Sequence, residues 1–275
     1  QLKIEKFLIN ASHCVETVRK SIADADLIKH TGIHFDVSDE SSELLGTSGA
    51  LKKARDWIGN ETLVVCNGDV ISNFDLKKML EFHIRKSSKL TIHTRSFSNA
   101  EEKYANISYD QDGRVKSFGD KTNNGIMFSG TYIIDPALID RLPLGFSDLR
   151  PALLEPLVSE KQLFAYSEDC EWFDTGSVQA YVRTNFELLS RIPSFRGLVE
   201  VKMKEAFNDV WVPRGWSQSL ADESFKRPVI LNGSQKEWDI SKNTFGPYFL
   251  GLNAPKNRNF PHQNALVSLE GVSKL

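Results

Sequence analysis

Apolar residues along the first two thirds of the chain follow two alternating patterns. Short runs that are continuously apolar, or that alternate with polar residues, are typical of β-strands, whereas apolar residues three or four positions apart are typical of helices. The predicted strands cover residues 6–10, 33–40, 62–66, 89–96, 105–110, 114–118 and 126–135. The predicted helices cover residues 11–22, 47–59, 73–86, 136–142, 148–159 and 178–192.

One strand and the helix after it show the two patterns most clearly. Thr62–Cys66 is a continuous apolar and β-branched run of the kind found in central parallel strands, and Leu76, Leu80 and Ile84 follow at helical spacing. Strands that alternate with helices of this length predict a mixed, mostly parallel sheet with helices on both faces. The sequence therefore predicts a three-layer α/β/α architecture.

The pattern changes after Pro193, where helical periodicity disappears and short apolar groups stand between Gly, Pro and Trp residues. The 275-residue length allows about two domains. We therefore predict an α/β core over residues 1–195 and a small all-β appendage over residues 196–275.

Composition and charge narrow the function classes. Lys and Arg total 34 against 36 Asp and Glu, so no basic field is available to hold a nucleic acid. Three widely spaced cysteines form neither a disulfide framework nor a zinc motif, and no run approaches the roughly 18 apolar residues of a membrane span. We expect a cytoplasmic protein that binds neither nucleic acid nor membrane.

Asp69 lies where α/β proteins bind their ligands, beyond the carboxyl end of a strand. Asn67-Gly68 lets the backbone turn closely, and Asp69 offers an oxygen ligand suited to Mg²⁺. An ordinary Asn-Gly turn with a capping aspartate explains the same residues. The residues alone leave both interpretations open.

Three further segments carry candidate ligand-binding groups. Glu43–Lys53 has two glycines and two hydroxyl groups before a helix, where free N–H groups attract phosphate or base edges, although simple helix capping is the alternative. Asp174 is a second candidate carboxylate or else an N-cap. Lys121 could neutralise a phosphate or be an ordinary surface lysine. No pattern of a nucleophile and its base supports covalent catalysis.

Five segments stand in the order LLGTSGAL, LVVCNGDV, FGDK, FSGTYIID and EWFDTGSVQAYVRTN. In this order they resemble the motifs of the sugar-1-phosphate nucleotidyltransferases, and most of all the bacterial group related to mannose-1-phosphate guanylyltransferase and N-acetylmuramate-1-phosphate uridylyltransferase. The resemblance implies a Rossmann-like core and an Mg²⁺-dependent reaction in which an NTP and a sugar 1-phosphate give an NDP-sugar and pyrophosphate. It favours GTP and mannose 1-phosphate as the substrates.

The resemblance also assigns roles to individual residues. Asp69 and Asp174 match the two aspartates that hold the metal, and Lys121 matches the lysine that contacts the sugar phosphate. Asp120 and Gly130 match sugar-binding positions. The positions that match the nucleotide-binding segments are Leu45, Gly46, Thr47, Gly49, Asn67 and Gly68.

Two departures from the family pattern bear on activity. The family's opening GxGxR loop and PK segment, which bind the triphosphate, are not found here, so we expect the sequence to start after them. Asp120 stands in place of a glutamate and Thr122 in place of a proline. A non-catalytic regulatory or assembly homologue is therefore the alternative. A glycosyltransferase of similar fold is disfavoured because no D-x-D motif stands at Asp69.

The C-terminal segments VWVPRGW, RPVILNG and NALVSLEGV resemble spaced turns of the left-handed β-helix that several relatives carry, in a degenerate form. An irregular β lobe fits them equally well. Apolar residues such as Trp211, Trp216 and Phe249 would suit a subunit contact. We therefore expect any homo-oligomer to form through this part of the chain.

Overall fold

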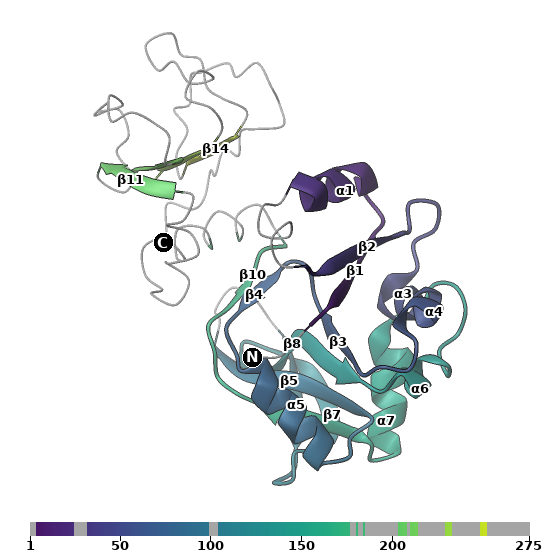
Figure 1. The fold of residues 1–275 in the computed structure, drawn as a ribbon. Coiled ribbons are helices and arrows are strands. Elements are labelled where there is room, and N and C mark those ends of the chain that lie inside the picture. Colours follow the sequence, from purple (N-terminus) through teal and green to yellow (C-terminus); the bar gives the residue numbers. More distant parts are fainter. Residues whose placement is uncertain are drawn as a thin grey trace. The chain divides into compact units, whose positions relative to one another are not determined.

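The computed structural model describes residues 4–24, 32–98 and 104–176, positions 180 and 184, and four short strands between residues 203 and 251. Figure 1 shows the elements, coloured along the sequence from purple at the N-terminus to yellow at the C-terminus. The chain divides into two compact units. The first comprises residues 1–68 and 74–170, and the second comprises residues 69–73 and 171–275.

The centre of the first unit is a four-stranded sheet in the order β3 (Leu63–Cys66), β8 (Asn124–Ile134), β5 (Leu90–Ser98) and β9 (Leu163–Ser167). β8 runs antiparallel to both of its neighbours, whereas β5 and β9 pair in parallel. The mixed sheet is thus confirmed, but it is less parallel than predicted, because β8 lies between β3 and β5.

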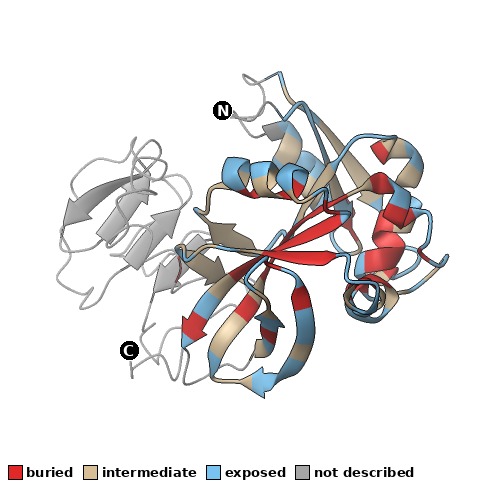
Figure 2. Cartoon of the chain, turned by 90° about the horizontal axis from the view of Figure 1, so that it is seen from below, coloured by how far each residue is buried: buried red, intermediate tan, exposed pale blue. Residues whose placement is uncertain are grey.

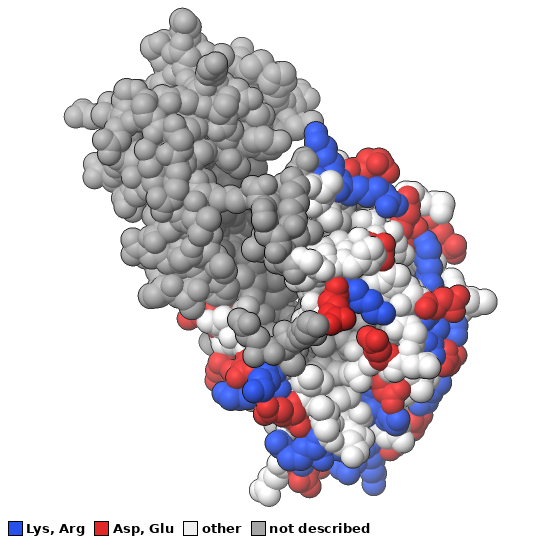
Figure 3. Space-filling model, in the orientation of Figure 1, with Lys and Arg blue, Asp and Glu red and all other residues white. Residues whose placement is uncertain are grey.

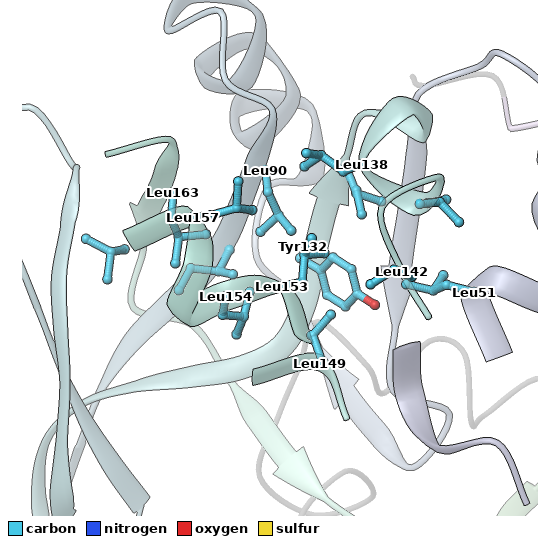
Figure 4. Packing of buried hydrophobic residues seen from close by; sticks show 14 of the residues in the cluster. Leu51, Leu90, Tyr132, Leu138, Leu142, Leu149, Leu153, Leu154, Leu157 and Leu163 are labelled. Atoms are coloured by element: carbon cyan, nitrogen blue, oxygen red, sulfur yellow. The ribbon is translucent and has the colours of Figure 1, made fainter. Parts of the chain in front are cut away.

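Helices cover both faces of this sheet. One face carries Leu90, Ile92 and Tyr132 and packs against a group of short helices. These are α3 (Gly46–Lys53), α4 (Arg55–Ile58), α6 (Pro136–Ile139), the π-helix η1 (Arg150–Leu154) and α7 (Glu155–Ser159). Figure 4 shows leucines from these helices and from the segments next to them around the Tyr132 ring, and Figure 2 shows the buried strands in red.

The opposite face is covered by α5 (Leu76–Arg85). This helix begins after Asp75, whose carboxylate accepts a hydrogen bond from the Lys78 N–H at 3.1 Å. Its buried His83 lies 2.8 Å through Nδ1 from the Thr91 hydroxyl of β5. Because Thr91 and Leu90 are neighbours on one strand, they face opposite sides of the sheet. The predicted three-layer α/β/α arrangement is therefore confirmed.

Two smaller strand pairs complete the first unit. β1 (Lys6–Ala11) and β2 (His34–Asp39) pair in parallel, with α1 (Val15–Asp24) between them in the chain. β6 (Tyr104–Tyr109) and β7 (Val115–Thr122) form a hairpin. At its predicted turn, Gly113 has a φ of 83°, and the Asp110 carboxylate accepts hydrogen bonds from two turn N–H groups.

The second unit contains one pair of three-residue strands, β4 (Val70–Ser72) and β10 (Trp172–Asp174), which the sequence patterns did not predict. Four more strands form a sheet in the order β11 (Met203–Phe207), β12 (Val210–Pro213), β13 (Val229–Asn232) and β14 (Tyr248–Gly251). Only β12 and β13 pair in parallel, as successive β-helix turns would.

Two predicted helices are interrupted in the structure. The predicted helix over 47–59 divides at Ala54, and the one over 148–159 begins with the π-helix. The predicted helix over 178–192 lies, except for two positions, outside the described residues, as does the predicted domain boundary near residue 195. Along the described residues, no helix is long and apolar enough to cross a membrane.

An irregularity in the pairing of β5 with β8 encloses a histidine. Between the pairs Ile92–Tyr132 and Thr94–Phe128, β5 contributes only His93, while β8 contributes Ser129–Thr131. The His93 ring is fully buried, stacks on Phe74 at 4.0 Å and lies 2.8 Å through Nδ1 from the Ser129 hydroxyl. Burial lowers the pKa of His93 to about 4, against smaller opposing effects of Glu168 and Asp169.

This low pKa predicts an acid-sensitive stability. Between pH 6.5 and 4 the unfolded chain binds a proton at His93 that the folded chain does not, so the free energy of unfolding should fall as the pH drops through this window. The loss should reach a few kcal/mol. Denaturant titrations at several pH values should show a shallower decline for His93→Phe, and parallel curves for the two proteins would contradict the prediction.

Candidate active site

One group of predicted site residues, within the first unit, lies where the chain leaves β3. The Asn67 N–H donates to the carbonyl of Gly130 at 3.1 Å. Gly130 has a φ of 89°, and a methyl group there would lie 2.7 Å from the Asn67 side-chain nitrogen. Only glycine therefore allows this backbone conformation and the close approach of the Asn67 amide.

Within the second unit, two aspartates come together. In the antiparallel pair of β4 and β10, Asp174 stands opposite Val70. The Thr175 N–H and hydroxyl both donate to the Asp69 carbonyl, at 2.7 and 2.8 Å. Although 106 positions separate Asp69 from Thr175, these bonds and the strand pairing hold the two carboxylate-bearing segments side by side.

Gly176 lies close to both carboxylates. A methyl group on it would stand 2.9 Å from Asp69 Oδ2 and 3.0 Å from Asp174 Oδ1. The Gly176 N–H also donates to Asp174 Oδ1 at 2.7 Å, which fixes that side chain. Within the described part of the chain, no third His, Cys, Asp or Glu joins the pair. Two converging carboxylates are nevertheless a set of oxygen donors that a hard divalent cation accepts.

The predicted base-binding segment is held by a neighbouring loop. The Ser48 and Gly49 N–H groups both donate to the Ser147 carbonyl, at 2.9 and 3.4 Å. A methyl at Gly46 would lie 2.7 Å from that carbonyl oxygen, and one at Gly49 would clash with the Gly145 carbonyl. The glycines thus allow close loop packing, and two of the N–H groups expected to be free are already bonded.

Residues of this segment differ in exposure. Leu45 and Gly49 are buried, whereas Thr47 is exposed and lines a cavity of about 380 Å³ in the first unit. Most of the cavity wall is apolar, and it includes Tyr132 of β8 and Ala105, Ile107 and Phe118 of the hairpin. Its polar members also include Asn67, directly after β3, and Asp148 and Arg150. Of the predicted site residues, the structure therefore brings Thr47 and Asn67 to one cavity.

The hairpin presents Lys121 on the same side as cavity-lining residues. Lys121 pairs with Ala105 and Phe118 pairs with Ile107, so β7 has one residue more than β6 between these pairs. An extra residue in one strand turns the side chains after it to the other face of that strand. Residues that stand directly opposite each other in a strand pair point to the same face. Lys121 therefore shares the face of Ala105, whereas Asp120 lies within the bulge; both residues are exposed.

Several cavity residues carried no signal in the sequence. Tyr132 stands in an apolar strand, so the sequence pattern predicts a buried core residue there. Asp148 and Arg150 stand at the start of a predicted helix, where polar residues are ordinary. Gly176, which belongs to the aspartate pair and not to the cavity wall, was visible only as the residue two positions after Asp174. Each of these residues lies next to residues that are distant in the sequence, so local patterns could not indicate its role.

A mixed sheet between two helical layers defines an α/β protein, a class whose ligands bind beyond the carboxyl ends of the strands. The sequence model described as "Nucleotidyl transferase" matches residues 1–191, which is most of the chain. The chain belongs to this family.

Curated relatives include mannose-1-phosphate guanyltransferase beta-B of Xenopus laevis, 28% identical over 64% of this chain and 49% of that protein. Mannose-1-phosphate guanylyltransferase of Mycobacterium tuberculosis is 28% identical over 56% and 45%. UTP–glucose-1-phosphate uridylyltransferase of Synechocystis is 27% identical over 90% and 66%. The chain thus spans about half the length of the two guanylyltransferases.

Solved structures agree on the fold. HddC from Yersinia pseudotuberculosis has a TM-score of 0.55 at 24% identity, covering 65% of this chain and 76% of that one. The same protein complexed with GMP-PN has a TM-score of 0.53 at 25% identity, covering 64% and 75%.

The position of Gly176 allows a direct test of the carboxylate pair. Gly176→Ala should weaken Mn²⁺ binding by about tenfold or more, because the added methyl would displace both carboxylate oxygens. Mn²⁺ titration followed by electron paramagnetic resonance would measure this, with unfolding midpoints to confirm the fold. Gly119→Ala, whose methyl would meet only ordinary contacts at 3.4 Å and beyond, is the control. Equal affinity in the two variants would contradict the proposed geometry.

Proposed function

We propose that this protein transfers a nucleotidyl group from an NTP to a sugar 1-phosphate, giving an NDP-sugar and pyrophosphate. The convergence of Asp69 and Asp174 over Gly176 is the observation that carries the proposal. Membership of the nucleotidyl transferase family and relatives named for this reaction support it.

The reaction needs no side-chain nucleophile. A phosphate oxygen of the sugar 1-phosphate forms a bond to the α-phosphorus of the NTP, while the bond from that phosphorus to the pyrophosphate oxygen breaks and its electron pair leaves with pyrophosphate. The protein's part is to align the two phosphates and to offset their negative charge. Two carboxylates, a lysine and fixed amide groups are suited to that task.

Asp69 and Asp174 would hold Mg²⁺, which prefers one or two carboxylates together with substrate phosphate oxygens and water. When bound, the ion neutralises charge that develops on the phosphates. The hydrogen bond from the Gly176 N–H keeps Asp174 Oδ1 in position. Lys121, on the cavity side of its hairpin, would supply a positive charge to the sugar phosphate.

Guanine and mannose are the proposed base and sugar. Two guanylyltransferase relatives and the guanine nucleotide analogue bound to HddC support this choice. The uridylyltransferase of Synechocystis, which aligns with 90% of this chain, makes UTP and glucose 1-phosphate the second pair to test. A cytoplasmic location and assembly through residues 196–275 remain predictions.

A non-catalytic role in regulation or assembly is the second candidate. The carboxylate of Asp120 is one methylene shorter than the glutamate of the family pattern, and the N–H groups of Ser48 and Gly49 are bonded within the protein. Both features would weaken substrate contacts. The intact pair of Asp69 and Asp174 favours catalysis.

The reaction can be tested by measuring pyrophosphate release with GTP or UTP and mannose or glucose 1-phosphate, using the protein expressed from its natural gene. Asp69→Asn and Asp174→Asn should each lower kcat/KM at least about 100-fold, since each removes a charge facing the phosphates. Asp112→Asn, in the exposed turn of the β6–β7 hairpin, is the matched control.

Each result of this assay favours one of the two candidates. Turnover that depends on both aspartates supports the transferase. No release with any pair, together with no binding of GTP or UTP in calorimetry, would favour the non-catalytic homologue.

A further inference from the structure

We propose that Ser129, held by the buried imidazole of His93, is a positioning residue for nucleotide binding: it keeps the bulge around Gly130 in the shape that orients the Asn67 amide. This inference rests on the proposed function, because it concerns how the NTP is bound. It gives roles to two buried residues to which the sequence analysis gave none.

The bulge lies where β8 passes from one partner strand to the other. Phe128 pairs with Thr94 of β5, whereas Thr131 pairs with Cys66 of β3. The register of β8 against β5 skips residues 129–131, and His93 alone stands opposite them. The ladder with β5 therefore does not fix the backbone of this stretch, and side-chain contacts have to hold it.

His93 contacts the bulge from the opposite strand. Its Nδ1 lies 2.8 Å from the Ser129 hydroxyl, and neither residue is more than 1% exposed. The imidazole stacks on Phe74 at 4.0 Å, and its centre lies 6.2 Å from that of the Tyr166 ring. The Tyr166 hydroxyl in turn donates to Glu168 at 2.7 Å. These contacts orient the imidazole, so Nδ1 holds the Ser129 hydroxyl in one place.

Ser129 is followed directly by Gly130, which contacts Asn67 in two ways. The Gly130 carbonyl accepts the Asn67 N–H at 3.1 Å. The Gly130 α-carbon also lies so close to the Asn67 side chain that an added methyl group would stand 2.7 Å from its amide nitrogen. A change in the backbone at Ser129 would therefore move both contacts. Asn67 lines the cavity of the first unit beside Thr47, another predicted nucleotide-binding residue.

Short-range contacts matter here because the surface charge is mixed. Figure 3 shows acidic and basic side chains interspersed over the visible described surface, without a broad patch of one sign. Such a surface attracts an anion only weakly. Hydrogen bonds weaken steeply when their angles and distances change, so the orientation of the Asn67 amide affects the affinity for a nucleotide that it contacts.

β5 carries a second buried histidine contact that serves as a control. His83 Nδ1 lies 2.8 Å from the Thr91 hydroxyl, and both residues are buried. Thr91 pairs with Ile133 in the regular part of the β5–β8 ladder. Removal of the hydroxyl from Thr91 or from Ser129 breaks the same kind of hydrogen bond, but only Ser129 lies in the bulge.

Ser129→Ala and Thr91→Val are therefore the matched variants. We would measure the dissociation constants of GTP and UTP by calorimetry with Mg²⁺, and the KM and kcat for the NTP by pyrophosphate release. Ser129→Ala should raise the dissociation constant and the KM about five- to tenfold, the factor that one net hydrogen bond contributes, with kcat changed less than about threefold. Thr91→Val should change none of them. Equal effects of the two variants would overturn the inference.

A double variant tests whether Ser129 acts through Asn67. In the Asn67→Ala protein, Ser129→Ala should not raise the KM for the NTP any further, because the group that it positions is gone. A merely structural role of Ser129 would give the same fold-change in both backgrounds, which would contradict the proposal.

His93 is tested by two substitutions that keep an amide group at different places. The ring is neutral at pH 7, because burial lowers the pKa of His93 to about 4, so a neutral amide can replace it. Asparagine places its amide where Nδ1 of histidine lies, and glutamine places it where Nε2 lies. His93→Asn should therefore keep the KM for the NTP near the natural value, whereas His93→Gln should match Ser129→Ala. The same KM in both variants would remove the role of His93.

Amide hydrogen exchange followed by NMR reports on the bulge without turnover. In Ser129→Ala the Asn67 N–H should exchange about tenfold faster, because its acceptor on Gly130 shifts. The Asp135 N–H, which donates to the Lys89 carbonyl at 2.9 Å beyond the other end of β8, should keep its rate. Equal acceleration at both amides would indicate a general loss of stability and overturn the inference.

The outcomes separate the inference from the function on which it rests. Turnover with unchanged NTP affinity in Ser129→Ala leaves the transferase standing and removes the positioning role. Nucleotide binding that weakens in Ser129→Ala, in a protein that releases no pyrophosphate, keeps the positioning role and removes the transferase. If neither GTP nor UTP binds the natural protein, both proposals fail.

Discussion

The site depends on the pairing of two very short strands. β4 and β10 have three residues each, too few to be stable alone, yet their register sets Asp174 opposite Val70. The two hydrogen bonds from Thr175 to the Asp69 carbonyl then fix how far one segment slides along the other. Because strand register determines which face a side chain takes, a shift of one residue would separate the carboxylates.

Glycine residues, which have no side chain, determine the geometry of these sites as much as the polar side chains do. Gly130 leaves room for the Asn67 amide, Gly176 leaves room between two carboxylates, and Gly49 lets a helix rest on the Gly145 carbonyl. In each case a single methyl group would approach another atom too closely. The glycines therefore set the spacing of the polar groups, which is information that side-chain chemistry alone does not carry.

Local patterns predicted the local structure well. The strands around Val64 and Ile92 and the helix containing Met79 follow from periodicity within a few residues, and the family motifs indicated Asp69 and Asp174 before any geometry was known. The pairing of β4 with β10 could not be predicted in this way, because its strands are too short to show a period. The antiparallel course of β8 and the bulge near Lys121 depend on contacts between distant segments.

The segment 69–73 belongs to one compact unit although its flanking residues belong to the other. Its strand partner, β10, is synthesised about a hundred residues later. During translation, the segment that carries Asp69 therefore has no strand to pair with until β10 has left the ribosome. Contacts between such distant positions form late and slow the search for the native topology. A ligand that bridges the two aspartates would then bind only after β4 and β10 have paired, and would stabilise the folded chain relative to its precursors.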